Sequence, residues 1–138
     1  MADNAPFAVN RPPFPNVVVG FNQRVKVHVL TFTGANGTSV MLQSLSTAGC
    51  TVTYVSEGVY DFTFPAGGTG AVGWVVVCPP VTSANTVADT RMFALDSDLL
   101  SFATGAGRLT AVDGSATPIV SDVIGTQTLL IYVLEPVV

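Results

Sequence analysis

Hydrophobic and polar residues alternate along much of this chain with a period of two, the spacing of a β-strand that is buried on one face. Residues 24–32 read RVKVHVLTF, and residues 50–55 read CTVTYV. In the first of these segments the polar side chains share one face and the valines the other: Arg24, Lys26 and His28 against Val25, Val27 and Val29. Both segments are therefore predicted to be half-buried strands.

Three more segments have strand patterns. Residues 59–64 (VYDFTF) place their aromatic rings on one face and Asp61 on the other. Residues 72–78 (VGWVVVC) form a continuous apolar run that ends at Pro79, which is typical of a strand buried on both faces. Residues 126–134 (TQTLLIYVL) are predicted to be the last strand, because no helix cap precedes them and Pro136 follows.

Turn residues separate these segments at short intervals. Asn36-Gly37 predicts a tight hairpin turn, and Glu57-Gly58 predicts a second turn. Shorter strands are expected at residues 17–19, 39–43, 90–95, 99–103 and 108–112. No stretch of ten residues has a helical pattern. The predicted fold is all-β: a single antiparallel β-sandwich over residues 17–138, jelly-roll-like, preceded by an arm.

The arm comprises residues 1–16 and contains Pro6, Pro12, Pro13 and Pro15. Proline fixes φ and removes the N–H donor, so an extended segment is expected. Two interpretations stay open: a disordered tail, or an arm that lies on a neighbouring subunit. The aromatic residues favour the second, since disordered tails are usually poor in them. The predicted partner-binding residues are Phe7, Arg11 and Phe14.

The chain is unusually poor in charge. Charged residues make up 10% of the sequence and hydrophobic residues 49%, and the formal net charge is −4. A free protein of this size usually carries about 25% charged residues, so a subunit of a larger assembly is favoured. The five basic residues form no cluster, which argues against nucleic acid as a partner. Neither a membrane-spanning stretch nor a signal peptide is expected.

Candidate chemistry is sparse. His28 is the only histidine, so it forms no zinc site with other imidazoles, and no nucleophile motif accompanies it. Asp96 and Asp98 suit either a calcium-binding loop or a turn that hydrogen-bonds its own backbone, and the turn is favoured. The Gly67–Gly70 loop lacks the Lys-Ser or Lys-Thr of a phosphate-binding loop. No enzyme activity, metal or cofactor is predicted.

Two cysteines and one tryptophan complete the candidates. Cys50 and Cys78 are expected to be buried free thiols, with a disulfide as the alternative. Trp74 is expected in the core. The alternative is a platform for stacking a sugar, which requires an exposed ring with polar groups nearby.

Three segments together carry a resemblance: GVYDFTFP (58–65), GWVVVC (73–78) and ATPIVSDV (116–123), the last followed by an apolar strand. This order resembles the small β-sandwich modules of tailed-phage virions, which occur as head decoration (cement) proteins and at fibre tips. The resemblance implies a homotrimer on the capsid surface, made in the host cytoplasm, with the major capsid protein as partner and no enzymatic activity. The alternative function is a receptor- or glycan-binding module of a fibre or tail.

Overall fold

The structure is a computed structural model that describes residues 17–18, 22–78 and 90–136. These residues form nine strands and one short 3-10 turn (η1, Gln43–Leu45), and no α-helix occurs among them. The strand bounds are β1 Val17–Val18, β2 Gln23–Ala35, β3 Thr38–Met41, β4 Thr51–Ser56, β5 Val59–Thr63, β6 Val72–Cys78, β7 Arg91–Leu95, β8 Ala106–Asp113 and β9 Gly125–Pro136. All pairings are antiparallel. The all-β prediction is confirmed.

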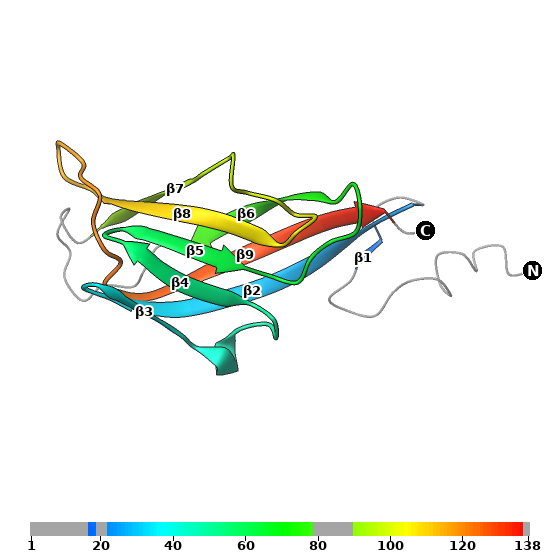
Figure 1. Cartoon of the computed structure of the whole chain (residues 1–138), viewed down its shortest axis with the longest axis horizontal. Helices are drawn as coiled ribbons and strands as arrows, with labels where there is room; N and C mark the ends of the chain where they lie inside the picture. The colour runs from blue at the N-terminus through cyan, green and yellow to red at the C-terminus, as the bar shows by residue number, and fades with distance from the viewer. Residues whose placement is uncertain (1–16, 19–21, 79–89, 137–138) are drawn as a thin grey trace, which may run out of the picture.

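Sheet A has the strand order β1-β2-β9-β6, with β3 also paired to β2. Its centre is the long pair β2 and β9, which stay in register from Gln23↔Pro136 to Gly34↔Gly125. Strand β6 covers the other edge of β9, from Val72↔Leu134 to Cys78↔Thr128. Figure 1 shows these strands running along the length of the molecule.

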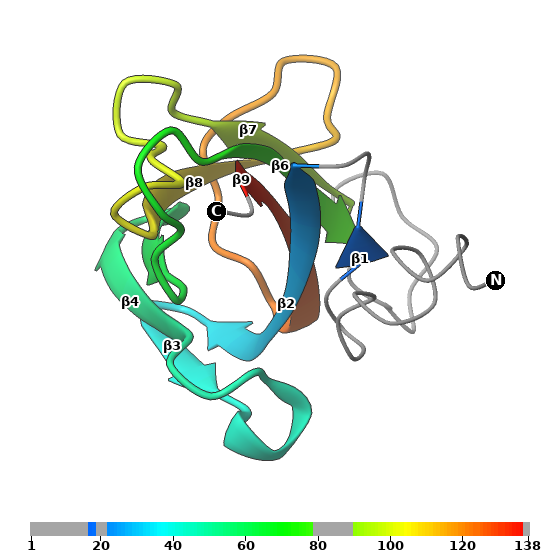
Figure 2. The same ribbon diagram turned by 90° about the vertical axis from the view of Figure 1, so that its right-hand side faces the viewer.

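Sheet B has the strand order β4-β5-β8-β7 and lies against sheet A, as the end-on view of Figure 2 shows. Its hairpins β4–β5 and β7–β8 are joined through the pairing of β5 with β8. Strands from both sheets contribute the buried core, so the fold is sandwich-like. The core residues are Leu30, Phe32, Cys50, Tyr60, Phe62, Phe64, Leu109, Ala111, Val123, Leu129, Ile131 and Val133.

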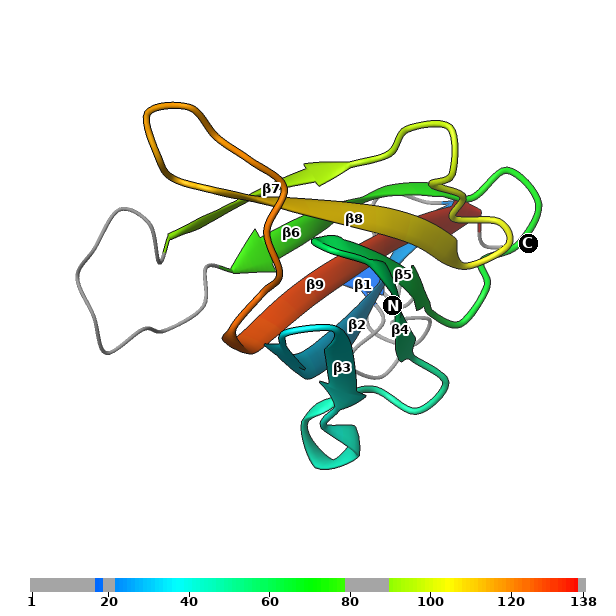
Figure 3. The same ribbon diagram turned by 60° about the vertical axis from the view of Figure 1, so that its left-hand side comes forward.

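One carboxylate ties the two sheets together at one end. Asp122 is 8% exposed and lies in the connection that runs from β8 of sheet B to β9 of sheet A (Figure 3). It accepts the N–H of Gly37 at 2.8 Å and that of Gly58 at 2.6 Å. Both predicted turns are present, and both glycines have the positive φ that a side chain would strain (75° and 67°).

Two predictions about the strands are wrong. Residues 99–103 form turns and a single bridge, Ser101↔Ala106, because Asp96 starts a turn there and Gly105 reverses the chain. Strand β6 is not buried on both faces: its residues alternate between exposed and half-buried. Periodicity cannot tell a doubly buried strand from one whose outer face is also apolar. The predicted arm, residues 1–16, lies outside the described residues.

Candidate binding surface

Part of the outer face of sheet A, which points away from the core, is apolar. Register places nine side chains on it in three rows of three, one each from β2, β9 and β6. We call them the apolar face: Val25, Leu134 and Val72; Val27, Tyr132 and Trp74; Val29, Leu130 and Val76. Three of these side chains are 41–56% exposed: Val72, Trp74 and Val76. Contiguous apolar surface outside the core is a feature of interaction sites.

An aromatic pair lies in the middle row of the apolar face. The rings of Trp74 and Tyr132 stack with centroids 5.2 Å apart and an interplanar angle of 15°. Cross-strand aromatic pairs stabilise a sheet, and here each ring covers one face of the other. Trp74 is 50% exposed, so the expectation that it packs in the core is wrong. Its position follows from register, because Gly73 and Val75 on β6 take the inward positions.

The outer face of sheet B has a different chemistry. Its centre is an ion pair between Asp61 on β5 and Arg108 on β8, which lie opposite each other. The guanidinium donates to both carboxylate oxygens, at 2.6 and 3.0 Å, and holds the pKa of Asp61 below its usual value. Threonines surround this pair: Thr51, Thr53, Thr63 and Thr110. The centre of the outer face of sheet B is therefore polar, while Val55 and Met92 are exposed apolar residues elsewhere on this sheet.

Strand β2 points its polar side chains toward the interior and its valines toward solvent, the reverse of the usual arrangement in a half-buried strand. Glu135 on β9 is 4% exposed and forms ion pairs with Arg24 (2.6 Å) and Lys26 (2.8 Å). It also accepts the N–H of Gly68 at 3.2 Å. Burial alone would raise the pKa of Glu135, but the hydrogen bonds from Lys26 and Arg24 outweigh this and lower it. These charges pair with each other at one end of the sandwich interior. The valines of β2 occupy the alternate positions of the strand and therefore face outward.

His28 follows Lys26 on the same inward face and is 7% exposed. Its ring lies 6.4 Å from that of Phe64, and no described residue hydrogen-bonds either ring nitrogen. Burial lowers the pKa of His28, and the positive charge of Lys26 lowers it further. Among the described residues, no nucleophile or carboxylate hydrogen-bonds the imidazole.

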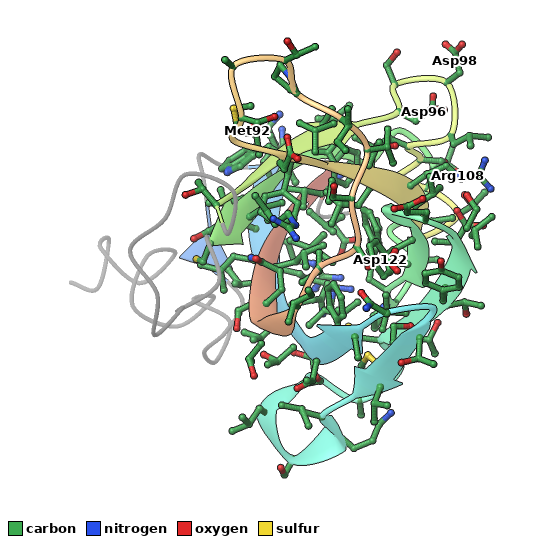
Figure 4. The ribbon with its side chains drawn as sticks, turned by 90° about the vertical axis from the view of Figure 1, so that its left-hand side faces the viewer. Met92, Asp96, Asp98, Arg108 and Asp122 are labelled. Atoms are coloured by element: carbon green, nitrogen blue, oxygen red, sulfur yellow. The ribbon has the colours of Figure 1, made fainter. Side chains whose placement is uncertain are left out.

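The acidic loops form turns. Asp96 accepts the N–H of Asp98 at 3.0 Å, so this loop hydrogen-bonds its own backbone, as favoured from the sequence. Figure 4 shows these two residues together, with Asp122 well apart from them. Asp113 likewise accepts the hydroxyl of Ser115 at 2.6 Å. Among residues 17–18, 22–78 and 90–136, no three His, Cys, Asp or Glu side chains form a metal-binding group.

The two thiols are free, as predicted, but they differ in burial. Cys50 is 2% exposed in the core, and burial raises its pKa to about 11. Cys78 is exposed at the end of β6, one row beyond Val76 and on the same side as the apolar face. The expectation that Cys78 is buried is therefore wrong, for the same reason as for Trp74.

The predicted binding residues Phe7, Arg11 and Phe14 lie outside the described residues. The apolar face itself was missed at the sequence level. A signal for it is present in β9, where residues 129–134 are apolar at both the odd and the even positions, which point to opposite faces of the sheet. In an antiparallel sheet with one solvated face, the outward positions are normally polar. A strand that is apolar at both inward and outward positions therefore indicates a covered outer face.

No family model, curated protein or solved structure matches this chain. Within the described part of the chain, no helix has the length and apolarity needed to cross a membrane.

Proposed function

We propose that this protein is a structural subunit of a virion: a decoration or cement protein that binds the major capsid protein of a tailed-phage head as a homotrimer. The observation that carries the proposal is the apolar face of sheet A, which lies outside the core. Such a face gains free energy when another chain covers it. The resemblance of residues 58–65, 73–78 and 116–123 to phage virion sandwiches supplies the type of assembly.

The size of the apolar face supports repeated rather than single contacts. Three strands about 4.8 Å apart and five residues long at about 3.4 Å give roughly 250 Å². At about 25 cal/mol per Å², covering this area contributes about 6 kcal/mol gross. Association costs about 4–15 kcal/mol in lost freedom, so one such contact is marginal. Several such contacts formed at once around a ring of copies add up, which suits a homotrimer.

A jelly-roll-like topology is part of the same proposal. The chain passes between the sheets at β3–β4, β5–β6, β6–β7 and β8–β9, which supports it, while β4–β5 and β7–β8 stay inside sheet B. The arm residues Phe7, Arg11 and Phe14 are proposed as partner contacts. Arginine and aromatic residues are enriched at interfaces, and the arm supplies both.

Two measurements test this function. Light scattering at low micromolar concentration should give three times the 14.3 kDa mass of one chain. Phage heads stripped of decoration should bind the full chain, whereas a chain lacking residues 2–15 should stay folded and lose the binding. A monomer that fails to bind such heads would contradict the proposal.

A glycan-binding fibre or tail module is the second candidate, and the exposure of Trp74 favours it. Its immediate neighbours on the face are Val72, Val76 and Tyr132, so few polar groups are at hand for sugar hydroxyls. Saturable binding on a glycan array that Trp74→Ala abolishes would favour this candidate over the structural one.

A further inference from the structure

The apolar face is too small to be a complete interface by itself. A stable protein–protein interface buries about 800 Å² on each partner, and the face offers roughly 250 Å². An extended peptide of six to eight residues, at about 3.1 Å per residue, covers about 19–25 Å. The face therefore matches a peptide segment in size better than a second folded subunit.

The stacked pair of Trp74 and Tyr132 indicates which peptide chemistry fits. Proline-rich segments dock on surfaces lined by aromatic side chains, because their extended backbone loses little entropy on binding. The chain carries such a segment in its own N-terminal arm, where residues 12–15 read PPFP. Phe14 and Phe7 add apolar side chains for the flanking valines and leucines. None of the nine residues of the face is acidic, so the face offers no counter-charge for Arg11. We therefore expect Arg11 to contact a different surface.

The position of β1 limits where the arm can bind on its own sheet. Val17 pairs with Val25, which belongs to the first row of the apolar face. If this register continued toward the N-terminus, Pro13 would lie opposite Val29. That edge of β2 is already occupied, because Val29 donates its N–H to the Thr47 hydroxyl at 2.9 Å and accepts the Thr47 N–H at 2.7 Å. The edge of β2 is therefore closed to Pro13 and the residues before it.

We propose that the arm, residues 1–16, of one copy of this chain occupies the apolar face of a neighbouring copy, with Pro12–Pro15 on the Trp74–Tyr132 pair. Prolines stiffen the segment directly before β1, so it resists the sharp reversal needed to fold over its own sheet. Reciprocal exchange of arms closes a two-fold dimer, whereas arms passed in one direction around a ring close a trimer, the arrangement that the proposed assembly function requires. This inference rests on the proposed assembly function.

Cys78 provides a built-in probe, because it is exposed beside the face while Cys50 is buried. In Asn10→Cys, a thiol-specific bismaleimide should link the thiol introduced into the arm of one chain to Cys78 of another and give covalent dimers and trimers. The same variant with Cys78→Ser is the control and should give none. Links found only within one chain, or no links above the control, would overturn the proposal.

Matched substitutions test the face independently of the arm. Val76→Asp places a carboxylate on the apolar face, and Val55→Asp places one on the outer face of sheet B; the wild-type side chains are 41% and 45% exposed. Val76→Asp should weaken self-association by about tenfold or more, since it buries a charge. Val55→Asp should leave it unchanged. A trimer that survives Val76→Asp overturns the arm exchange while leaving the assembly function standing, whereas a wild-type monomer that does not bind heads contradicts both.

Discussion

The carboxylate of Asp122 accepts the N–H of Gly58 at 2.6 Å and so joins the β4–β5 turn to the connection that leads into β9. Its second oxygen accepts the N–H of Gly37 from the β2–β3 turn. A single buried side chain therefore holds two turns that belong to different sheets, and its removal leaves two N–H groups without their acceptor.

We expect Asp122→Ala to lower the free energy of unfolding by about 2–4 kcal/mol, the range for losing two charge-assisted hydrogen bonds at a buried site. Asp122→Asn, which keeps one acceptor oxygen, should cost about half as much. Asp98→Ala, in an exposed turn, is the control and should change stability by less than about 0.5 kcal/mol. Urea unfolding measures the stability of all three variants. Equal midpoints for Asp122→Ala and wild type would show that the hydrogen bonds of Asp122 do not stabilise the fold.

A substitution at Gly73 tests how closely β6 packs against Tyr132 and Phe102. A Cβ at this position would overlap the main-chain carbonyl oxygen of Tyr132 and lie 3.0 Å from the Phe102 ring. Gly73→Ala should therefore destabilise by about 2 kcal/mol or more, as overpacked sites do. Gly68→Ala is the matched control, since no described atom lies within 4 Å of its Cβ. Thermal unfolding should separate the two variants; a neutral Gly73→Ala would mean that β6 is not placed as described.

His28 makes stability depend on pH. Its pKa is lowered in the folded chain, by burial and then by Lys26, from the ordinary value of 6.5. The unfolded chain therefore binds a proton that the folded chain does not, and stability falls as pH drops below about 6.5 toward the lowered value. His28→Leu should remove this slope below about pH 6.5. If the variant and the wild type lose stability in parallel over this range, His28 is not the group responsible.

Glu135 should contribute more to stability than Asp61, although both form ion pairs with arginine. Glu135 is 4% exposed and neutralises two cations, whereas Asp61 is 44% exposed and pairs with one. Glu135→Gln leaves Arg24 and Lys26 close together without a counter-charge, and we expect a loss of about 2–3 kcal/mol. Asp61→Asn should cost about 1 kcal/mol or less. Chemical denaturation in low salt measures the difference, and the reverse order would contradict the described burial.

The two thiols should react at different rates. Cys78 is exposed, while Cys50 is buried with a pKa raised to about 11, so it forms little thiolate near neutral pH. An aromatic disulfide reagent should therefore titrate one thiol rapidly in the native protein and both in urea. Cys78→Ser should abolish the rapid phase. Two rapid thiols in the native protein would show that Cys50 is accessible.

Alternation by itself determined most of the strands. In β5 the order VYDFT fixes Tyr60 and Phe62 on one face and Asp61 on the other, because successive side chains in a strand point to opposite sides. Asn36-Gly37 and Glu57-Gly58 located their turns because glycine accepts the positive φ that these turns need. Such features depend on local chemistry, so they can be read before any fold is known.

Only the tertiary structure decided which face of sheet A lies inside. The pattern of β2 separates its valines from Arg24, Lys26 and His28, but it does not contain Glu135, which lies 111 residues from Arg24 and pairs with it. In the same way, the run VGWVVVC is apolar at both odd and even positions. Only its pairing with β9 places Trp74 on the outer face of the sheet. Register between distant strands assigns the faces, and register is a long-range property of the fold.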